Sequence, residues 1–265
     1  MRESRIRTVL AVNQVAYGAW VQMANPESVE YAGRAGYDFV LIDREHGSFD
    51  LETTVQLLRA AAGLAITPVV RVPDRNPTEI MRVLDAGAMG VLVPGVSTPA
   101  QASDAVRAAR YAPSGNRGAC PYTLATIPFH GSWSEFTEWS NRTISVWLLI
   151  EGVEGVGNID RILEVPGIDA ICLGPFDLSQ AMGLPGQTDH PAVVDKLKGI
   201  VVKARARGIE VVAVPFATTP QGIRDEAQKW VSAGCRIVAG AVDRAVLRIG
   251  LAEACAAMRE TGTGA

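Results

Sequence analysis

Eight short apolar runs, separated by segments with helical patterning, constrain the fold of this 265-residue chain more than any other feature. Runs of this length and composition are typical of buried strands. Strands that alternate with helices predict a parallel sheet, and eight right-handed units of this kind close into a (β/α)8 barrel. We therefore predict an α/β fold, a TIM barrel that forms a single domain over residues 1–265, with strands near 17–23, 37–43, 67–73, 90–96, 145–151, 168–175, 210–216 and 235–242.

Prolines at the expected helix starts support this alternation. In four places a small polar residue, which can cap a helix, is followed by proline, whose missing N–H costs nothing at the first helical position. The glycines between Gly152 and Gly157 predict a turn into a helix capped by Asn158. A doubly wound open sheet is the alternative fold, but no G-x-G-x-x-G motif follows the first strand, so the barrel is favoured. The four capped starts are Asn25-Pro26, Asn76-Pro77, Thr98-Pro99 and Thr219-Pro220.

The segment from Arg244 to Arg259 predicts a final helix, because alanines and leucines recur there at helical spacing. We expect its apolar face either to cover the barrel or to pack on a neighbouring subunit. Residues 260–265 are predicted to form a disordered tail.

Composition and charge exclude several classes of partner. The formal net charge of -3 gives no basic field, so nucleic acid is not a favoured partner. No run of 18 apolar residues predicts a membrane span, and the first seven residues lack the apolar core of a signal peptide. The four cysteines are scattered without a C-x-x-C pair, which is typical of reduced thiols in the cytosol. We therefore expect a cytoplasmic protein that binds neither membrane nor nucleic acid.

Charged residues end four of the eight apolar runs. In a TIM barrel the active site lies at the carboxyl ends of the strands. One such residue alone is explained as a solvated strand edge, but four on one rim predict a site. These residues are Asp43 with Glu45 and His46 after the second run, Arg71 after the third, Glu151 after the fifth and Asp177 after the sixth.

Glu151 and Asp177 follow adjacent strands, so their carboxylates are expected to lie close together. Two such carboxylates repel each other unless a cation or a proton lies between them. Oxygen ligands without a Cys or His cluster suit a divalent metal ion, Mg²⁺, Mn²⁺ or Co²⁺. A proton-sharing acid pair, as in a glycosidase, is the alternative. The cation is favoured because Arg71 and His46 converge on the same rim and aromatic residues for a sugar platform are few.

A divalent cation, an arginine and a histidine together suit enolisation next to a carbonyl. The cation supplies Lewis-acid activation of a 2-oxo acid. Arg71 can hold the developing enolate oxygen or the carboxylate, and His46 can move the proton. None of the four lysines lies at a strand end, so a Schiff-base mechanism is not favoured. This chemistry serves aldol cleavage, aldol addition and decarboxylation equally well.

Five motifs, spread in order from about Tyr17 to Val242, resemble one known family, the HpcH/HpaI aldolases. These are metal-dependent (class II) pyruvate aldolases. The motifs are Leu41-Ile42-Asp43-x-Glu45-His46, Val70-Arg71-Val72-Pro73, Leu84-Asp85-x-Gly87-Ala88 with Leu92-Val93-Pro94, Ile150-Glu151, and Gly174-Pro175-x-Asp177-Leu178-Ser179.

The resemblance implies a lyase that cleaves and forms 4-hydroxy-2-oxo acids, such as 4-hydroxy-2-oxoheptanedioate, from pyruvate or hydroxypyruvate and an aldehyde. It implies aromatic-compound catabolism and a homo-oligomer, a trimer or hexamer, in which the last helix packs on a neighbour. It makes Glu151 and Asp177 metal ligands and Arg71 the residue that stabilises the enolate. It pairs His46 with Asp85, from the same or another subunit, for acid–base work.

The resemblance also makes Asp43 the residue that orients a water on the cation, whereas it gives Glu45 at most a supporting role. Substrate-binding positions are expected at Arg71, Gly174, Pro175, Phe176, Trp20 and Phe216. Trp20 either packs in the barrel core or walls the pocket, and Phe216 faces the aldehyde side. Two alternative functions stay open: a citrate-lyase-β-like lyase that acts on a CoA thioester, and a non-catalytic barrel that binds a metabolite.

Overall fold

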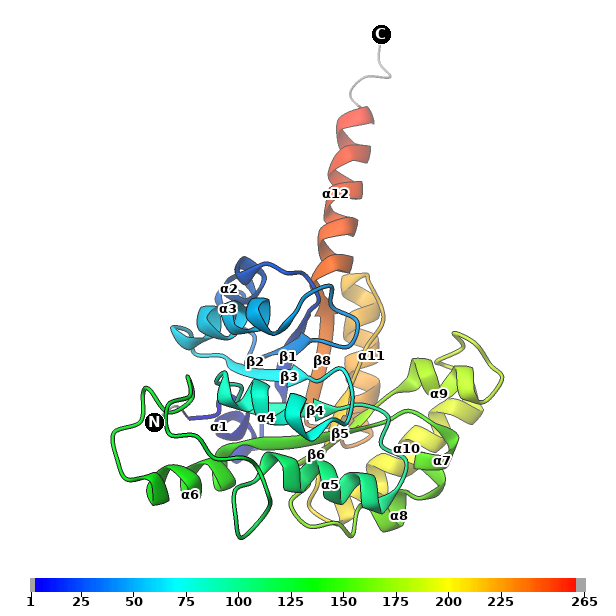
Figure 1. The fold of residues 1–265 in the computed structure, drawn as a ribbon. Helices are drawn as coiled ribbons and strands as arrows, with labels where there is room; N and C mark the ends of the chain where they lie inside the picture. The colour runs from blue at the N-terminus through cyan, green and yellow to red at the C-terminus, as the bar shows by residue number, and fades with distance from the viewer. Residues whose placement is uncertain (1–2, 261–265) are drawn as a thin grey trace.

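The computed structural model describes residues 3–260 and contains a closed barrel of eight parallel strands in chain order (Figure 1). The (β/α)8 prediction is confirmed. Each strand overlaps its predicted run, but most strands end two or three residues early because the residues that follow form the loops of the rim. The strands are β1 (Ala16–Val21), β2 (Phe39–Asp43), β3 (Thr67–Arg71), β4 (Gly90–Val93), β5 (Ser145–Ile150), β6 (Ala170–Leu173), β7 (Glu210–Ala213) and β8 (Ile237–Val242).

Helices connect the strands and surround the barrel, and α1 precedes β1 (Figure 1). They are α1 (Arg5–Ala11), α2 (Pro26–Arg34), α3 (Leu51–Ala62), α4 (Pro77–Asp85), α5 (Pro99–Ala109), α6 (Trp133–Thr143), α7 (Val153–Gly157), α8 (Ile159–Ile162), α9 (Pro175–Ala181), α10 (Pro191–Ala206), α11 (Pro220–Ser232) and α12 (Asp243–Glu260).

The four predicted Asn-Pro and Thr-Pro helix starts are confirmed. At each start the polar residue is the N-cap, and its side chain accepts a hydrogen bond from a backbone N–H group of the first turn. These caps are Asn25, Asn76, Thr98 and Thr219. Asn158 is the N-cap residue of α8, as predicted, whereas the turn expected before it is the short helix α7. Asn158 lies at the start of α8, but its amide donates to the carbonyl of Ser97 at 2.9 Å and accepts no cap hydrogen bond.

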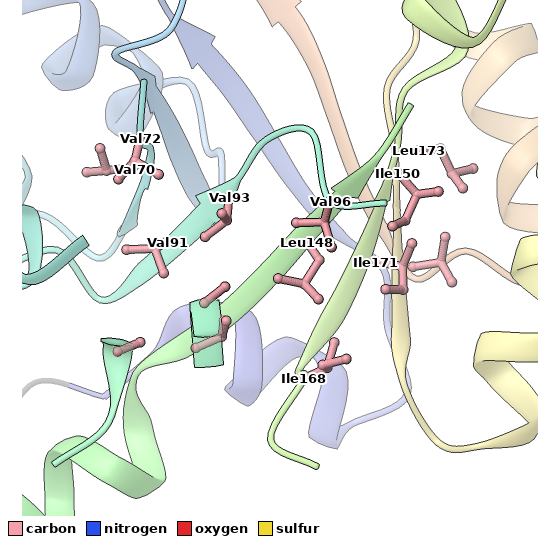
Figure 2. Packing of buried hydrophobic residues seen from close by; sticks show 14 of the residues in the cluster. Val70, Val72, Val91, Val93, Val96, Leu148, Ile150, Ile168, Ile171 and Leu173 are labelled. Carbon is pink, nitrogen blue, oxygen red and sulfur yellow. The ribbon is translucent and has the colours of Figure 1, made fainter. Parts of the chain in front are cut away.

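Alternation along each strand builds two hydrophobic layers, because successive side chains of a strand point to opposite faces. Phe39 of β2 points into the barrel, where its ring meets that of Trp147 at 5.5 Å, edge to face. Val91 and Leu148 belong to the outer layer between the strands and the helices, part of which Figure 2 shows. Burial of each such side chain stabilises the fold by roughly 1.5–3 kcal/mol. The barrel is therefore a filled core that holds the strand ends in fixed positions.

Helix α12 is confirmed where the final helix was predicted, but it does not cover its own barrel. It has no buried residue, and Figure 1 shows it extending away from the strands, in orange to red. The first of the two expected arrangements is therefore wrong, and packing on a neighbouring subunit stays a prediction. Of the predicted tail, Glu260 is the last residue of α12 and 261–265 lie outside the described residues. Between residues 3 and 260, neither α12 nor any other helix is long and apolar enough to cross a membrane.

Candidate active site

Asp43 and Arg71 form a buried ion pair at the rim, because the register of β2 and β3 places the two residues side by side. Arg71 Nε and Nη2 donate to the two carboxylate oxygens of Asp43 at 2.8 and 2.6 Å. The Asp43 carboxylate also accepts from Gln22 Nε2 and from the backbone N–H groups of Glu45 and His46. Burial would raise the pKa of Asp43, but the hydrogen bonds and charge of Arg71 outweigh it and lower the pKa.

Five hydrogen bonds use the acceptor capacity of the Asp43 carboxylate, which has about four lone-pair sites. The geometry thus supports Asp43 as the residue that positions Arg71 and the turn to His46. It does not support the predicted role of Asp43 in orienting a water on a cation, because no acceptor site is left for a hydrogen bond that the water would donate.

Arg71 also contacts Trp20 and Glu45. The guanidinium lies 4.7 Å from the ring centroid of Trp20, whose Nε1 donates to the carbonyl of Ala239 at 2.9 Å. Trp20 is buried in the barrel core and also lines the cavity above it, so both expectations for this residue hold. Burial would lower the pKa of Arg71, but Asp43 and Glu45 outweigh it and raise the pKa. Arg71 is therefore a fixed cation in the middle of the rim.

Glu45 has a clearer place than the sequence indicates. Its Oε2 lies 2.9 Å from Arg71 Nη1, yet this buried oxygen makes no hydrogen bond of good geometry. Burial raises the pKa of Glu45, against the charges of Arg71 and His46, and the negative charges of Asp43 and Asp177 add to the rise. Arg71 therefore pairs with two carboxylates, those of Asp43 and Glu45, and its single positive charge balances only one of them.

Glu151 directly follows β5 and carries the largest perturbation of a carboxylate in the site. Its pKa rises to about 7, chiefly through burial and then through the charges of Glu45 and Asp177. The backbone N–H of Gly95 donates to Glu151 Oε1 at 2.8 Å and acts in the opposite direction. A Cβ atom on Gly174 would lie 2.4 Å from the Cβ of Glu151, so only glycine at 174 leaves room for this side chain.

Asp177 enters the site from the first turn of α9, the helix that Pro175 begins directly after β6. His46, Arg71, Glu151 and Asp177 line one cavity of about 760 Å³. The predicted substrate-binding residues line the same cavity: Trp20, Gly174, Pro175, Phe176 and Phe216. The rings of Phe176 and Phe216, both about half exposed, lie 5.9 Å apart at its mouth. The structure thus brings together every predicted site residue except Asp85, with Asp43 directly beneath.

Asp85 is the exception because it ends α4, and the carboxyl end of that helix leads to the amino-terminal end of β4, away from the rim. Its Oδ1 accepts from Arg117 Nη2 at 2.6 Å. A pairing of Asp85 with His46 within one chain is therefore wrong. The alternative, a pairing between two subunits, stays a prediction.

Sequence reasoning missed Gln22 and Gly95. Gln22 lines the cavity and holds Asp43, and Gly95 holds Glu151 through its backbone. Gln22 directly follows β1, so the same strand-end rule that found Glu151 could have found it. Gly95 acts through its N–H, for which the sequence carries no side-chain signal.

A divalent cation fits this donor set. The three carboxylates of Glu45, Glu151 and Asp177 influence one another, Arg71 is already shared with Asp43, and Glu45 Oε2 lacks a hydrogen bond. Burial is the main cause of the raised pKa of Glu151, and a cation between Glu151 and Asp177 would offset it together with the added repulsion of Glu45 and Asp177. Within residues 3–260 no group of three His, Cys, Asp or Glu side chains is placed to hold a metal ion. The chain would thus supply two ligands, and substrate and water would complete the shell.

A barrel rim with two carboxylates beside a fixed arginine and a histidine can hold a divalent cation that polarises a carbonyl group. The chain belongs to the HpcH/HpaI aldolase/citrate lyase family, whose sequence pattern matches residues 16–239. It is 36% identical to the 5-keto-4-deoxy-D-glucarate aldolase of Escherichia fergusonii over 251 residues, 93% of each chain.

Two solved structures have the same architecture over nearly the whole chain. Citrate synthase SbnG superposes with a TM-score of 0.87 at 32% identity and covers 97% of this chain and 98% of its own. The HpcH/HpaI aldolase from Desulfitobacterium hafniense DCB-2 superposes with a TM-score of 0.88 at 28% identity, with 96% of both chains covered. The family match and the identity to the 5-keto-4-deoxy-D-glucarate aldolase support lyase activity of the aldolase type. The named aldolase acts on a sugar acid, so the expected role in aromatic catabolism stays unsupported.

Proposed function

We propose that this protein is a class II aldolase that reversibly cleaves and forms 4-hydroxy-2-oxo acids, with pyruvate or hydroxypyruvate as donor and an aldehyde as acceptor. The observation that carries the proposal is the cavity in which Arg71, fixed by Asp43, faces the carboxylates of Glu151 and Asp177, with His46 on the same wall.

Glu151 and Asp177 would hold the divalent cation, Mg²⁺, Mn²⁺ or Co²⁺. When bound, such a cation supplies Lewis-acid polarisation of the keto group of a 2-oxo acid. Glu151 must be deprotonated for this role, and its pKa of about 7 places that change near neutral pH.

In the remaining steps, side chains of the protein bind the substrate and transfer the proton. The Arg71 guanidinium binds the oxygen that becomes negative as the donor loses its proton, and its two bonds to Asp43 keep it in place during the reaction. His46 accepts the hydroxyl proton during cleavage and returns it during addition, and Asp85 of another subunit orients its ring. Gly174, Pro175 and Phe176 wall the donor side, whereas Phe216 walls the aldehyde side.

Assembly into a homo-oligomer, a trimer or hexamer, is part of the proposal. Leu247, Leu251 and Met258 of α12 are 48%, 62% and 68% exposed. They lie on one face of the helix at i, i+4 and i+11. A neighbouring subunit that packs on this face would bury it. The four free cysteines are in keeping with the cytoplasm as the site of action.

The experiment that tests the proposal combines a variant with a chelator. Arg71→Ala should lower kcat for cleavage of a 4-hydroxy-2-oxo acid by about a thousandfold, because the developing negative charge loses its fixed cation. Treatment with EDTA should abolish turnover in the wild type, and added Mn²⁺ should restore it. Full activity in EDTA would contradict the role given to the cation.

A second candidate function is favoured by the likeness to citrate synthase SbnG. A condensation or cleavage that uses a CoA ester needs the same enolate chemistry on the same rim. Assays with free 2-oxo acids and with CoA esters separate the two. Cleavage of free 4-hydroxy-2-oxo acids without any response to CoA esters supports the aldolase, and turnover of the esters alone supports the alternative.

A further inference from the structure

Two arginines line the active-site cavity and have no role in the chemistry described above. Arg244 and Arg248 lie in the first turns of α12 and border the cavity together with Phe216. Neither forms an ion pair within residues 3–260, whereas Arg71 is shared between Asp43 and Glu45. The positive charge of these two arginines is therefore uncompensated in the part of the cavity that Phe216 and the first turns of α12 line.

The beginning of α12 is tied to the barrel, so these arginines have a defined place. The Asp243 carboxylate accepts from the backbone N–H groups of Gln22 and Met23, each at 3.0 Å, and of Arg244 at 2.8 Å. Ala241 adopts a left-handed conformation, with φ 59°, where the chain turns from β8 into the helix. The first turn thus stays at the end of β1 wherever the rest of α12 packs.

Arg244 also contacts the turn that carries His46. Its Nη2 donates to Ser48 Oγ at 2.8 Å, two residues beyond His46. Arg248 lies four residues further along the helix, so both side chains project from the same face. Guanidinium groups match the planar, bidentate geometry of carboxylate and phosphate groups, which favours an anion as their ligand.

We propose that Arg244 and Arg248 bind an anionic group, a carboxylate or a phosphate, on the aldehyde part of the substrate. The proposal rests on the aldolase function proposed above. With the donor between Arg71 and the Glu151–Asp177 pair, the far end of the substrate lies between Phe216 and the two arginines. Acidic aldehydes are then the preferred acceptors, and the compounds cleaved are 4-hydroxy-2-oxo acids with a second anionic group.

The test compares anionic with neutral acceptors in the wild type, Arg244→Gln, Arg248→Gln and the double variant. Pyruvate and Mn²⁺ are supplied with glyoxylate or succinic semialdehyde as carboxylates, D-glyceraldehyde 3-phosphate as a phosphate, and propanal as a neutral aldehyde. The ratio of kcat/KM for an anionic acceptor over that for propanal should fall about 10- to 100-fold in the double variant, mainly through KM. A fall confined to the carboxylates or to the phosphate identifies the anion.

Arg259→Gln is the matched control, because it removes a charge from the exposed last turn of the same helix. It should leave the ratio as in the wild type. An unchanged ratio in the double variant, or an equal loss for anionic and neutral aldehydes, would overturn the inference. Deuterium exchange into pyruvate by the wild type, which needs no acceptor, is measured in parallel. Its absence would show that the proposed function itself has failed.

Discussion

Glu151 is the residue at which burial, hydrogen bonding and charge meet. It is held by Gly95, packed against Gly174 and repelled by Glu45 and Asp177, and its pKa is about 7 instead of the usual 4.5. A carboxylate kept in such surroundings is costly for the fold of the metal-free protein. The proposed cation site would therefore lower the stability of the metal-free fold.

This cost predicts an unusual pH dependence of stability. Because the pKa of Glu151 is higher in the folded than in the unfolded chain, its contribution is fully present below about pH 4.5 and is lost as the pH rises through about 7. The metal-free protein should lose up to about 3 kcal/mol of unfolding free energy from this group between these values. Urea unfolding in EDTA at pH 5.5 and 8 measures the change.

Glu151→Gln is the control, since it should remove this part of the pH dependence while the other groups still titrate. Mn²⁺ should stabilise the wild type more at pH 8 than at pH 5.5, because cation and proton compete for the carboxylate. Equal pH dependence in the wild type and the variant would contradict the assignment.

At the residue scale, the sequence predicts which residues line the site better than it predicts the residues with which they pair. His46, Arg71, Glu151 and Asp177 can be found because each stands out at the end of an apolar run. The role of Asp43 depends on the β2–β3 register that pairs it with Arg71, and that register is fixed only by the folded sheet. Asp85 pairs with Arg117 instead of His46 within the chain, because α4 ends at the opposite end of the barrel from the rim, which the motif alone does not show.

At the scale of elements, the turn from β6 into α9 leaves no room for a side chain at Gly174, beside Glu151. Gly174→Ala would force its new methyl against Glu151, since the two Cβ atoms would lie 2.4 Å apart. We expect a loss of kcat of about 100-fold and weaker Mn²⁺ binding, because misplacement of one group by about 1 Å has this effect. Isothermal titration with Mn²⁺ and steady-state assays measure the two effects.

Gly199→Ala is the matched control for this substitution. Gly199 lies inside α10, and a Cβ atom there would meet nothing within 4 Å. This variant should keep activity and gain about 1 kcal/mol of stability from helix propensity. Normal activity of Gly174→Ala would show that the position of Glu151 is not critical.

Starts of elements are more predictable than their ends and their local chemistry. The four pairs of a polar residue and proline predict helix starts correctly, because the cap and the fixed proline φ are properties of adjacent residues. The carboxyl ends of the strands are shorter than predicted, since apolar residues such as Val96 continue the pattern while packing in a rim loop. Sequence spacing places Asn158 at a helix start, but it does not reveal that the side chain donates to Ser97 instead of accepting from the helix.

At the scale of the whole molecule, the barrel is predictable because length and eight alternating units leave few other topologies. The place of α12 is not, because a helix with an apolar face can be covered by its own barrel or by another subunit, and the amino-acid pattern is the same in both cases. The structure removes the first arrangement for the described chain.

The exposed apolar face of α12 predicts that assembly depends on it. Leu251→Asp should place a charge in the subunit interface and convert the oligomer to smaller species, since an unpaired buried charge is strongly unfavourable. Light scattering coupled to size-exclusion chromatography measures the mass. Glu253→Gln, on another face of the same helix, should leave the mass unchanged. A wild-type protein that is monomeric at micromolar concentration would contradict the proposed assembly.

The most direct test of the central claim is deuterium exchange into the methyl group of pyruvate, followed by NMR with Mg²⁺, Mn²⁺ and Co²⁺ in turn. It measures enolisation without any knowledge of the aldehyde. The wild type should exchange with at least one of these cations, stop in EDTA, and lose exchange by about a thousandfold in Arg71→Ala and Glu151→Gln. Exchange that continues in EDTA or in Glu151→Gln would contradict a reaction that depends on a cation held by the barrel rim.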